Sequence, residues 1–267
     1  MKNLLIDKKS GENIIVRVRD VSIGGQDKVL ISGPCSVENL DIMTEIALAL
    51  KNAGVHILRG GAFKPRTSPY DFQGLQVEGL KILKTSASLV DLPVVTEVVD
   101  IRDIDVVLKY ADMIQIGSRN MYNYSLLTEL GKLKVPVILK RGFSATLNEW
   151  MHAAEYIIKE GNCNVVLCER GIRTFENYTR NTLDLNSVTV IKQKYRLPVI
   201  VDPSHGTGLR EIVPQMSLAA VAAGADGLMI ESHINPDSAV SDARQTISIE
   251  TLINLYKKVK LLQNLNL

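Results

Sequence analysis

The stretch Val29-Leu30-Ile31-Ser32-Gly33-Pro34-Cys35-Ser36 joins a short aliphatic run to a cluster of small and polar residues. The same arrangement recurs seven more times along the chain. The later clusters begin at Arg59, Thr96, Gly117, Lys140, Cys168, Asp202 and Glu231. Short aliphatic runs separated by longer amphipathic stretches are typical of a parallel sheet with crossover helices. Eight of them predict an α/β protein with a (β/α)8 TIM-barrel fold, whose site lies at the carboxyl ends of the strands.

Amphipathic stretches of helical periodicity fill the intervals between the runs. Three of these stretches are followed by a glycine, the usual stop at the end of a helix, at Gly54, Gly161 and Gly224. The expected helices are 40–51, 75–89, 101–108, 125–131, 146–159, 188–195, 213–223 and 247–262. No linker or low-complexity segment separates them, so we expect residues 29–267 to form one catalytic barrel.

Residues 1–28 precede the first run and carry a different pattern. The segment 13–19 alternates in hydrophobicity and is followed by Ser22-Ile23-Gly24-Gly25, which predicts a short β-hairpin. We expect this N-terminal extension to plug the bottom of the barrel, where an open end would expose apolar side chains.

Composition excludes several classes of function. The formal net charge is only +2 and no dense Lys/Arg run occurs, which argues against a nucleic-acid binder. No apolar stretch approaches the roughly 18 residues of a membrane span, and the first ten residues contain no apolar core of a secretory signal. Three cysteines do not make a disulfide framework. We therefore expect a cytoplasmic protein that binds neither nucleic acid nor membrane.

Four residues, three of them at or just past the ends of runs, indicate a metal site: Cys35, His205, Glu231 and Asp242. A thiolate, an imidazole and two carboxylates suit divalent Mn, Fe, Co or Zn. A free cysteine is usually a small buried hydrophobe. The position of Cys35 after Gly33-Pro34 favours a function, whereas Cys163 and Cys168 lack such a setting and are expected in the core. His233 is two residues after Glu231, close enough to contact this metal ligand and help to orient it.

Cations gather at the same run ends: Arg59, Lys64, Arg119, Lys140 and Arg170, with Arg66 close by. Fixed positive charges in a partly dry cleft repel one another, so such a mouth must hold anions. Arginine suits bidentate recognition of phosphate or carboxylate, and lysine suits a point-charge contact. The number of cations indicates more than one phosphate, or a phosphate together with a carboxylate.

Six segments in chain order carry a resemblance to a known family: Gly33-Pro34-Cys35-Ser36, Lys64-Pro65-Arg66-Thr67-Ser68, Gly117-Ser118-Arg119-Asn120, Leu139-Lys140-Arg141-Gly142, Asp202-Pro203-Ser204-His205-Gly206-Thr207-Gly208 and Glu231-Ser232-His233. They resemble the type Iβ 3-deoxy-D-arabino-heptulosonate 7-phosphate (DAHP) synthases, and the similarity runs from about Val29 to Thr246. That family uses a divalent metal to condense phosphoenolpyruvate with erythrose 4-phosphate, the first step of the shikimate pathway to chorismate and the aromatic amino acids.

The resemblance implies a role for each matching residue. It makes Cys35, His205, Glu231 and Asp242 the metal ligands. It puts Arg59 and Lys64 at the phosphoenolpyruvate carboxylate, and Arg119, Lys140 and Arg170 around its phosphate. It assigns Arg66 and Thr67 to the phosphate of the sugar. No ACT-like, ferredoxin-like or chorismate mutase domain is fused to the barrel, so we expect the isolated short form, a homo-oligomer such as a dimer or tetramer, to be insensitive to Phe, Tyr, Trp and prephenate.

The residues also fit this chemistry without the name. A metal would polarise the aldehyde that C3 of phosphoenolpyruvate attacks, and water would then add at C2. Lys64 is the best candidate to pass protons, beside Cys35 and His205 as the other catalytic residues. Glu97 is expected to pair with a neighbouring arginine. Asp202 is expected to orient His205.

Three other functions are open to the sequence. In 3-deoxy-D-manno-octulosonate 8-phosphate synthase, which takes arabinose 5-phosphate, Lys-Ala-Asn-Arg-Ser typically stands where this chain has Lys64-Pro65-Arg66-Thr67-Ser68. A Schiff-base aldolase using Lys140 would leave the metal set idle and would survive a chelator. A non-catalytic phosphosugar-binding barrel would bind ligand without turnover.

Overall fold

Eight parallel strands close into a barrel in the computed structural model, which describes residues 4–65, 68 and 70–264. They are β3 (Val29–Gly33), β4 (Ile57–Arg59), β5 (Val94–Glu97), β6 (Met113–Ile116), β7 (Val137–Lys140), β8 (Val165–Glu169), β9 (Val199–Val201) and β10 (Gly227–His233). Each strand pairs with the next in the chain, and β10 closes the ring by pairing with β3. The two-residue β11 (Ile247–Ser248) adds to β10. The predicted (β/α)8 fold is confirmed.

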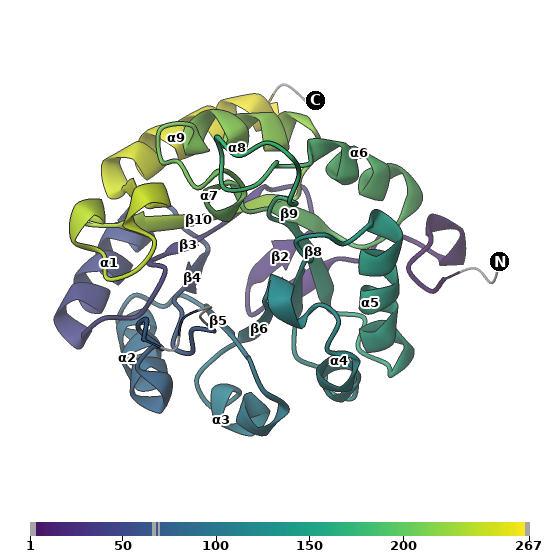
Figure 1. Ribbon diagram of the computed structural model, residues 1–267, viewed down its shortest axis with the longest axis horizontal. Coiled ribbons are helices and arrows are strands. Elements are labelled where there is room, and N and C mark those ends of the chain that lie inside the picture. The colour runs from purple at the N-terminus through teal and green to yellow at the C-terminus, as the bar shows by residue number, and fades with distance from the viewer. Residues whose placement is uncertain (1–3, 66–67, 69, 265–267) are drawn as a thin grey trace.

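Helices surround the ring of strands (Figure 1). The α-helices are α1 (Leu40–Asn52), α2 (Gln76–Leu89), α3 (Ile104–Val107), α4 (Tyr124–Gly131), α5 (Leu147–Lys159), α6 (Leu185–Lys194), α7 (Pro203–Thr207), α8 (Val213–Ala222) and α9 (Ile249–Asn264). Short 3-10 helices are η1 (Lys8–Ser10), η2 (Ile101–Asp103), η3 (Ser118–Asn120), η4 (Pro236–Ser238) and η5 (Ala243–Gln245). In the described part of the chain, no helix has the length and apolar character needed to cross a membrane.

Local signals explain where these helices begin. Thr146 accepts a hydrogen bond from the Glu149 backbone, and the Glu149 carboxylate accepts from the Thr146 backbone, a reciprocal cap that starts α5. The short helix α7 was not expected. It begins because the Asp202 side chain accepts from the backbone N–H of His205, with Pro203 at its first turn.

Side chains alternate between the barrel interior and the helix layer, as the pleat of a strand requires. One apolar residue from each of the eight strands points inward and joins a common cluster: Ile31, Ile57, Val95, Met113, Ile138, Val166, Ile200 and Met229. Sequence neighbours of these residues, such as Leu58, Leu139 and Leu167, instead join the larger cluster that includes the helices. The inward position two residues further along each strand belongs to the next layer, toward the carboxyl end.

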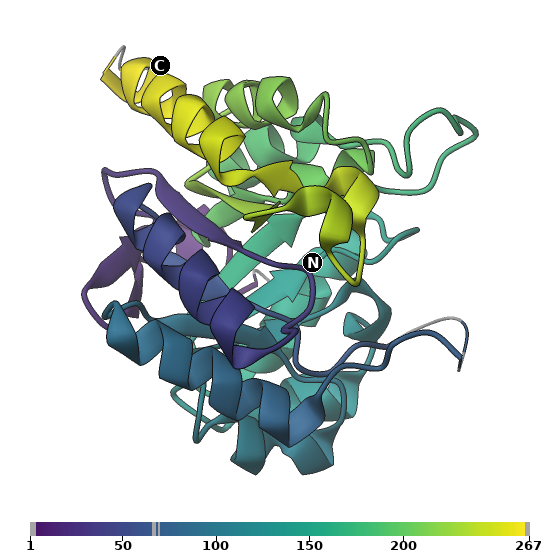
Figure 2. The ribbon, with the colours of Figure 1, turned by 90° about the vertical axis from the view of Figure 1, so that its left-hand side faces the viewer.

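The N-terminal extension forms the predicted hairpin. β1 (Val16–Val18) pairs antiparallel with β2 (Val21–Ile23), and Val16, Val18 and Ile23 belong to the same buried cluster as the inward strand residues. Gly24 lies against Pro198, directly before β9. The hairpin therefore closes the amino-terminal end of the barrel. The loop between β8 and α6 extends from the opposite end (Figure 2).

Candidate active site

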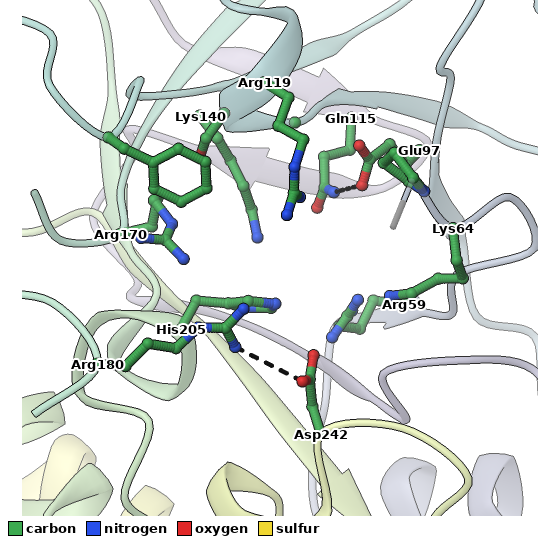
Figure 3. Close-up of a pocket in the computed structure, with 14 residues that line it drawn as sticks. Arg59, Lys64, Glu97, Gln115, Arg119, Lys140, Arg170, Arg180, His205 and Asp242 are labelled. Carbon is green, nitrogen blue, oxygen red and sulfur yellow. Dashed lines mark hydrogen bonds and ion pairs between the residues drawn. The ribbon is translucent and has the colours of Figure 1, made fainter. Parts of the chain in front are cut away.

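A cavity opens at the carboxyl ends of the strands (Figure 3). Its lining is rich in cations, with few apolar side chains: Arg59, Lys64, Pro65, Glu97, Gln115, Gly117, Ser118, Arg119, Lys140, Phe143, Arg170, Arg180, His205 and Asp242. All the described sequence-predicted substrate residues are among them. Arg66 and Thr67 lie outside the described residues.

Strand alternation explains how these side chains come to face one another. Counting two residues on from Ile57, Ile138, Ile200 and Met229 gives Arg59, Lys140, Asp202 and Glu231. All four are buried, so the barrel carries a charged layer directly above its apolar layer. Burying charge is costly unless it is paired, and these four are paired.

The first buried group joins Lys140, Asp202 and His205. Asp202 Oδ2 lies 2.6 Å from Lys140 Nζ and 2.7 Å from His205 Nδ1. Burial opposes ionisation of Asp202, but His205 and Lys140 hold the pKa of this carboxyl well below its usual range. The expected orientation of His205 by Asp202 is confirmed. Because burial lowers the pKa of His205, its Nε2 is available as a neutral ligand or base.

The second buried group is built on Glu231. Its Oε1 lies 2.6 Å from Arg59 NH1 and 3.4 Å from His205 Nε2, and its Oε2 accepts from Gln245 Nε2 at 2.5 Å. Although burial disfavours a charged carboxylate, His205 and Arg59 lower the pKa of Glu231. Glu231 is therefore an ionised oxygen ligand fixed on a strand.

Cys35, Glu231 and Asp242 form a cluster whose ligand atoms all lie within 4.8 Å of one another. Cys35 Sγ is 3.1 Å from Asp242 Oδ2 and 3.0 Å from Lys64 Nζ. His205 Nε2 borders this cluster through Glu231. A thiol and two carboxylates converging in a buried spot, with an imidazole beside them, fit a divalent transition metal. The side chains present are therefore compatible with such an ion.

Two arginines in the cavity have no ion pair with a carboxylate among the residues that the structure describes. They are Arg119 and Arg170, and both stack on the Phe143 ring, with guanidinium carbons 5.5 Å and 4.7 Å from its centre. Burial lowers the pKa of Arg170 to about 10, which still leaves it charged at neutral pH. With Lys140 they line one side of the cavity, opposite Arg59, Lys64 and Asp242 (Figure 3). An anion on that side would meet unpaired positive charge.

A second set of charges near the same strand ends faces away from the cavity. Arg141 NH1 lies 3.0 Å from Glu169 Oε2 and 2.8 Å from Asp184 Oδ2, between the strands and the helices. Arg141 and Glu169 are sequence neighbours of Lys140 and Arg170. Because side chains alternate along a strand, Arg141 and Glu169 point toward the helices, whereas Lys140 and Arg170 point into the cavity.

Two sequence expectations about these residues, for His233 and Cys163, are wrong, and one for Glu97 is tested only in part. Among the residues that the structure describes, Glu97 contacts Gln115, with Oε2 2.9 Å from Nε2, and no arginine, because Glu97 and Gln115 are direct neighbours across β5 and β6; Arg66 lies outside the described residues. His233 Nε2 lies 3.4 Å from Glu38 and not against Glu231, because two residues along a strand point at different levels of the barrel. Cys163 is exposed, since it precedes β8, whereas Cys168 is buried as expected.

Sequence reasoning also missed four residues of the site. Arg180, Gln115 and Phe143 line the cavity, and Gln245 contacts Glu231. Gln115 could have been found by alternation along β6. Arg180, Phe143 and Gln245 lie in loops or a short 3-10 helix, where no periodicity indicates direction.

Comparisons with known proteins agree with this geometry. The model of the DAHP synthetase I family matches residues 6–266. A phospho-2-dehydro-3-deoxyheptonate aldolase of Thermotoga maritima is 47% identical over 249 residues, which cover 93% of this chain and 74% of that relative. A 2-dehydro-3-deoxyphosphooctonate aldolase of Francisella tularensis is 29% identical, over 91% of this chain and 96% of the relative.

Solved structures extend the agreement to three dimensions. The crystal structure of the phospho-2-dehydro-3-deoxyheptonate aldolase (DAHP synthase) from Thermotoga maritima matches with a TM-score of 0.95 at 44% identity, covering 99% of this chain and 78% of that one. A truncated form of the synthase from the same organism matches with a TM-score of 0.91 at 41% identity, covering 97% and 96%. The chain is therefore an enzyme that belongs to the DAHP synthetase I family.

Proposed function

We propose that the chain condenses phosphoenolpyruvate with erythrose 4-phosphate and water, giving DAHP and phosphate, the first step of the shikimate pathway. One observation carries the proposal: a single cavity joins cations that, among the described residues, lack carboxylate partners to a cluster able to hold a divalent metal. The two substrates are anionic and need the cations, and the aldehyde of the acceptor needs the metal. We also propose that residues 29–267 act as one catalytic unit with residues 1–28 as its extension.

The donor would lie across the cavity between its two charged sides. Arg119, Lys140 and Arg170 would bind its phosphate, because neither Arg119 nor Arg170 has a carboxylate partner within the described part of the chain. Arg59 and Lys64 would meet its carboxylate on the opposite side. These contacts hold the donor in register with the acceptor, which lowers the entropic part of the barrier.

Cys35, Glu231 and Asp242, with His205 beside them, would hold the metal. Bound there, a divalent ion supplies Lewis acidity for the acceptor aldehyde. Mn, Fe, Co and Zn all suit this ligand set. Arg66 and Thr67 would bind the acceptor phosphate, as the family resemblance implies.

The reaction forms a bond from C3 of phosphoenolpyruvate to the aldehyde carbon. Water then adds at C2, and the bond between C2 and the phosphate oxygen breaks, so phosphate leaves. The new alkoxide needs a proton and the attacking water must lose one. Lys64 is the candidate carrier, since its Nζ donates to Cys35 and lies at the cavity wall. His205, held by Asp202, is placed to assist.

The rival readings fit the site less well. The relatives named octonate aldolases are 27–30% identical, far below the 47% of the heptonate relative. A Schiff-base mechanism would need a free amine, but Lys140 is held in a buried ion pair with Asp202. A cytoplasmic location and a homo-oligomeric state, dimer or tetramer, stay predictions from the sequence.

A phosphate-release assay tests the proposal. Phosphoenolpyruvate should release phosphate with erythrose 4-phosphate in the presence of divalent metal, and release should stop after treatment with a chelator. Preference for arabinose 5-phosphate would transfer the assignment to the octulosonate enzyme. Turnover that survives metal removal would contradict the proposed mechanism, and binding without turnover would make the barrel a non-catalytic receptor.

A further inference from the structure

Arg180 differs from the other cations of the cavity. It comes from the loop between β8 and α6, and its side chain is 40% exposed. Its NH1 donates to Gln245 Oε1 at 2.9 Å. The same NH1 lies 3.6 Å from Asp242 Oδ1 (Figure 3). Gln245 in turn donates to Glu231. One loop arginine thus reaches both carboxylates of the candidate metal cluster, one directly and one through an amide.

Backbone contacts hold this arginine close to Asp242. Its backbone N–H donates to the Thr207 carbonyl at 2.8 Å, and its stem passes over Gly208, where an added Cβ would lie 2.5 Å from the Arg180 Cβ. Asp242 has a φ of 54°, a left-handed conformation that a residue other than glycine adopts at some cost. Both partners are therefore positioned by the backbone.

The pair also separates two cavities. Arg180 and Asp242 line the active-site cavity and a second cavity beside it, whose other walls include Tyr178, Leu209 and Arg244. Because the Arg180 side chain is partly exposed, its guanidinium can swing without unpacking the core. A change in the pairing of Asp242 would therefore move a positive charge along the wall of the substrate cavity.

We propose that Arg180 competes with the metal ion for Asp242 and is released into the substrate cavity when the ion binds. The inference rests on the proposed metal site, but not on the identity of the acceptor. Arg180 pairs with the carboxylate that the ion needs, and a divalent ion on that carboxylate repels the guanidinium. The released guanidinium offers donors to a substrate anion. By reciprocity, metal and anion binding then strengthen each other.

Calorimetric titration of Mn²⁺ into the substrate-free protein tests the competition. Arg180→Gln should lower the Kd for Mn²⁺ about threefold to fivefold, the range expected for loss of a partly exposed ion pair. Arg244→Gln is the matched control: it removes the same charge from the wall of the second cavity, and should change the Kd by less. If Arg180 only held Asp242 in place, its loss would weaken Mn²⁺ binding, and that result would overturn the proposal. An equal effect of both variants would also overturn it, because the effect would then be general electrostatics.

Titration of phosphoenolpyruvate with and without Mn²⁺ tests the release. Mn²⁺ should strengthen phosphoenolpyruvate binding in the wild type, and the factor should shrink in Arg180→Gln. An undiminished factor would contradict the release. Failure of the wild type to bind Mn²⁺ would overturn the proposed metal site together with this inference. Normal Mn²⁺ binding with a different acceptor preference would revise the function alone.

Discussion

The two ends of this barrel, built from the same eight strands, hold opposite kinds of side chain. At the amino-terminal end, Val16, Val18 and Ile23 of the hairpin join the inward strand residues in one apolar cluster. At the carboxyl end the next inward positions are Arg59, Lys140, Asp202 and Glu231, buried and paired. On these four strands, one step of two residues separates a packed core from a charged site.

The difference shows how stability and function are divided within one sheet. Apolar burial at the lower end contributes favourable free energy. Buried ion pairs at the upper end contribute little net stability, because desolvation offsets their attraction. Substitutions at the lower end should therefore change unfolding, and substitutions at the upper end should change ligand affinity and turnover.

The largest expected effect is at the upper end, for Cys35→Ala. Loss of a residue that only hydrogen-bonds a metal ligand costs roughly 10–100-fold in metal affinity or activity. Loss of the ligand itself should lower metal affinity and turnover by more than that, while the fold is retained. Burial raises the pKa of the Cys35 thiol to about 11, so the ion must displace a proton and its affinity should rise with pH below that value. The variant should lose this pH dependence. Metal titration at several pH values measures both, and full activity of a metal-stripped variant would exclude Cys35 as a ligand.

At the lower end, Ile23→Ala should destabilise the protein by about 2–5 kcal/mol, because it leaves a cavity under the barrel. Its kcat at a temperature where it is folded should match the wild type. Ile15→Ala is the control, since Ile15 belongs to the same segment but is 51% exposed and should cost below about 0.5 kcal/mol. Urea unfolding measures both changes. Equal effects of the two substitutions would show that the hairpin does not plug the barrel.

Arg119→Ala should raise KM for phosphoenolpyruvate with little change in unfolding free energy. The lost charge-assisted contact should cost about 1.5–3 kcal/mol, or roughly tenfold to a hundredfold in KM. Arg102→Ala provides a control, because Arg102 is 84% exposed and pairs with Asp100 on the outside of the barrel. Steady-state kinetics with each substrate varied separates the effects. A rise confined to the KM of the acceptor would show that Arg119 does not bind the phosphate of phosphoenolpyruvate.

The smallest effect is expected for the ring beneath the arginines. Phe143→Leu should raise KM for phosphoenolpyruvate about twofold to fivefold, since each cation–π contact contributes about 0.5–1 kcal/mol. Phe143→Tyr should restore the wild-type KM, because it keeps the ring face. If tyrosine and leucine behaved alike, the ring would only fill space and would not position Arg119 and Arg170.

Much of the site could be predicted because barrel topology turns strand ends into neighbours. Cys35 and Asp242 are 207 positions apart in sequence, yet Sγ and Oδ2 lie 3.1 Å apart. The contact of Glu97 with Gln115 was not expected, because the polar end of β5 has several polar neighbours and the sequence does not rank them. Only the register, which sets Glu97 opposite Gln115, selects the partner.

The sequence by itself determined the fold and the end of the barrel that carries chemistry, because strand periodicity and run ends are local properties. Alternation even separates Lys140 in the cavity from Arg141 behind it. Only the tertiary structure decided which charges are neutralised, since pairing depends on distances across the barrel. It also brought Arg180 to Asp242 and Gln245. Loop residues have no periodicity to give their direction, and their contacts exist only once the strands that carry the loops have closed into a ring.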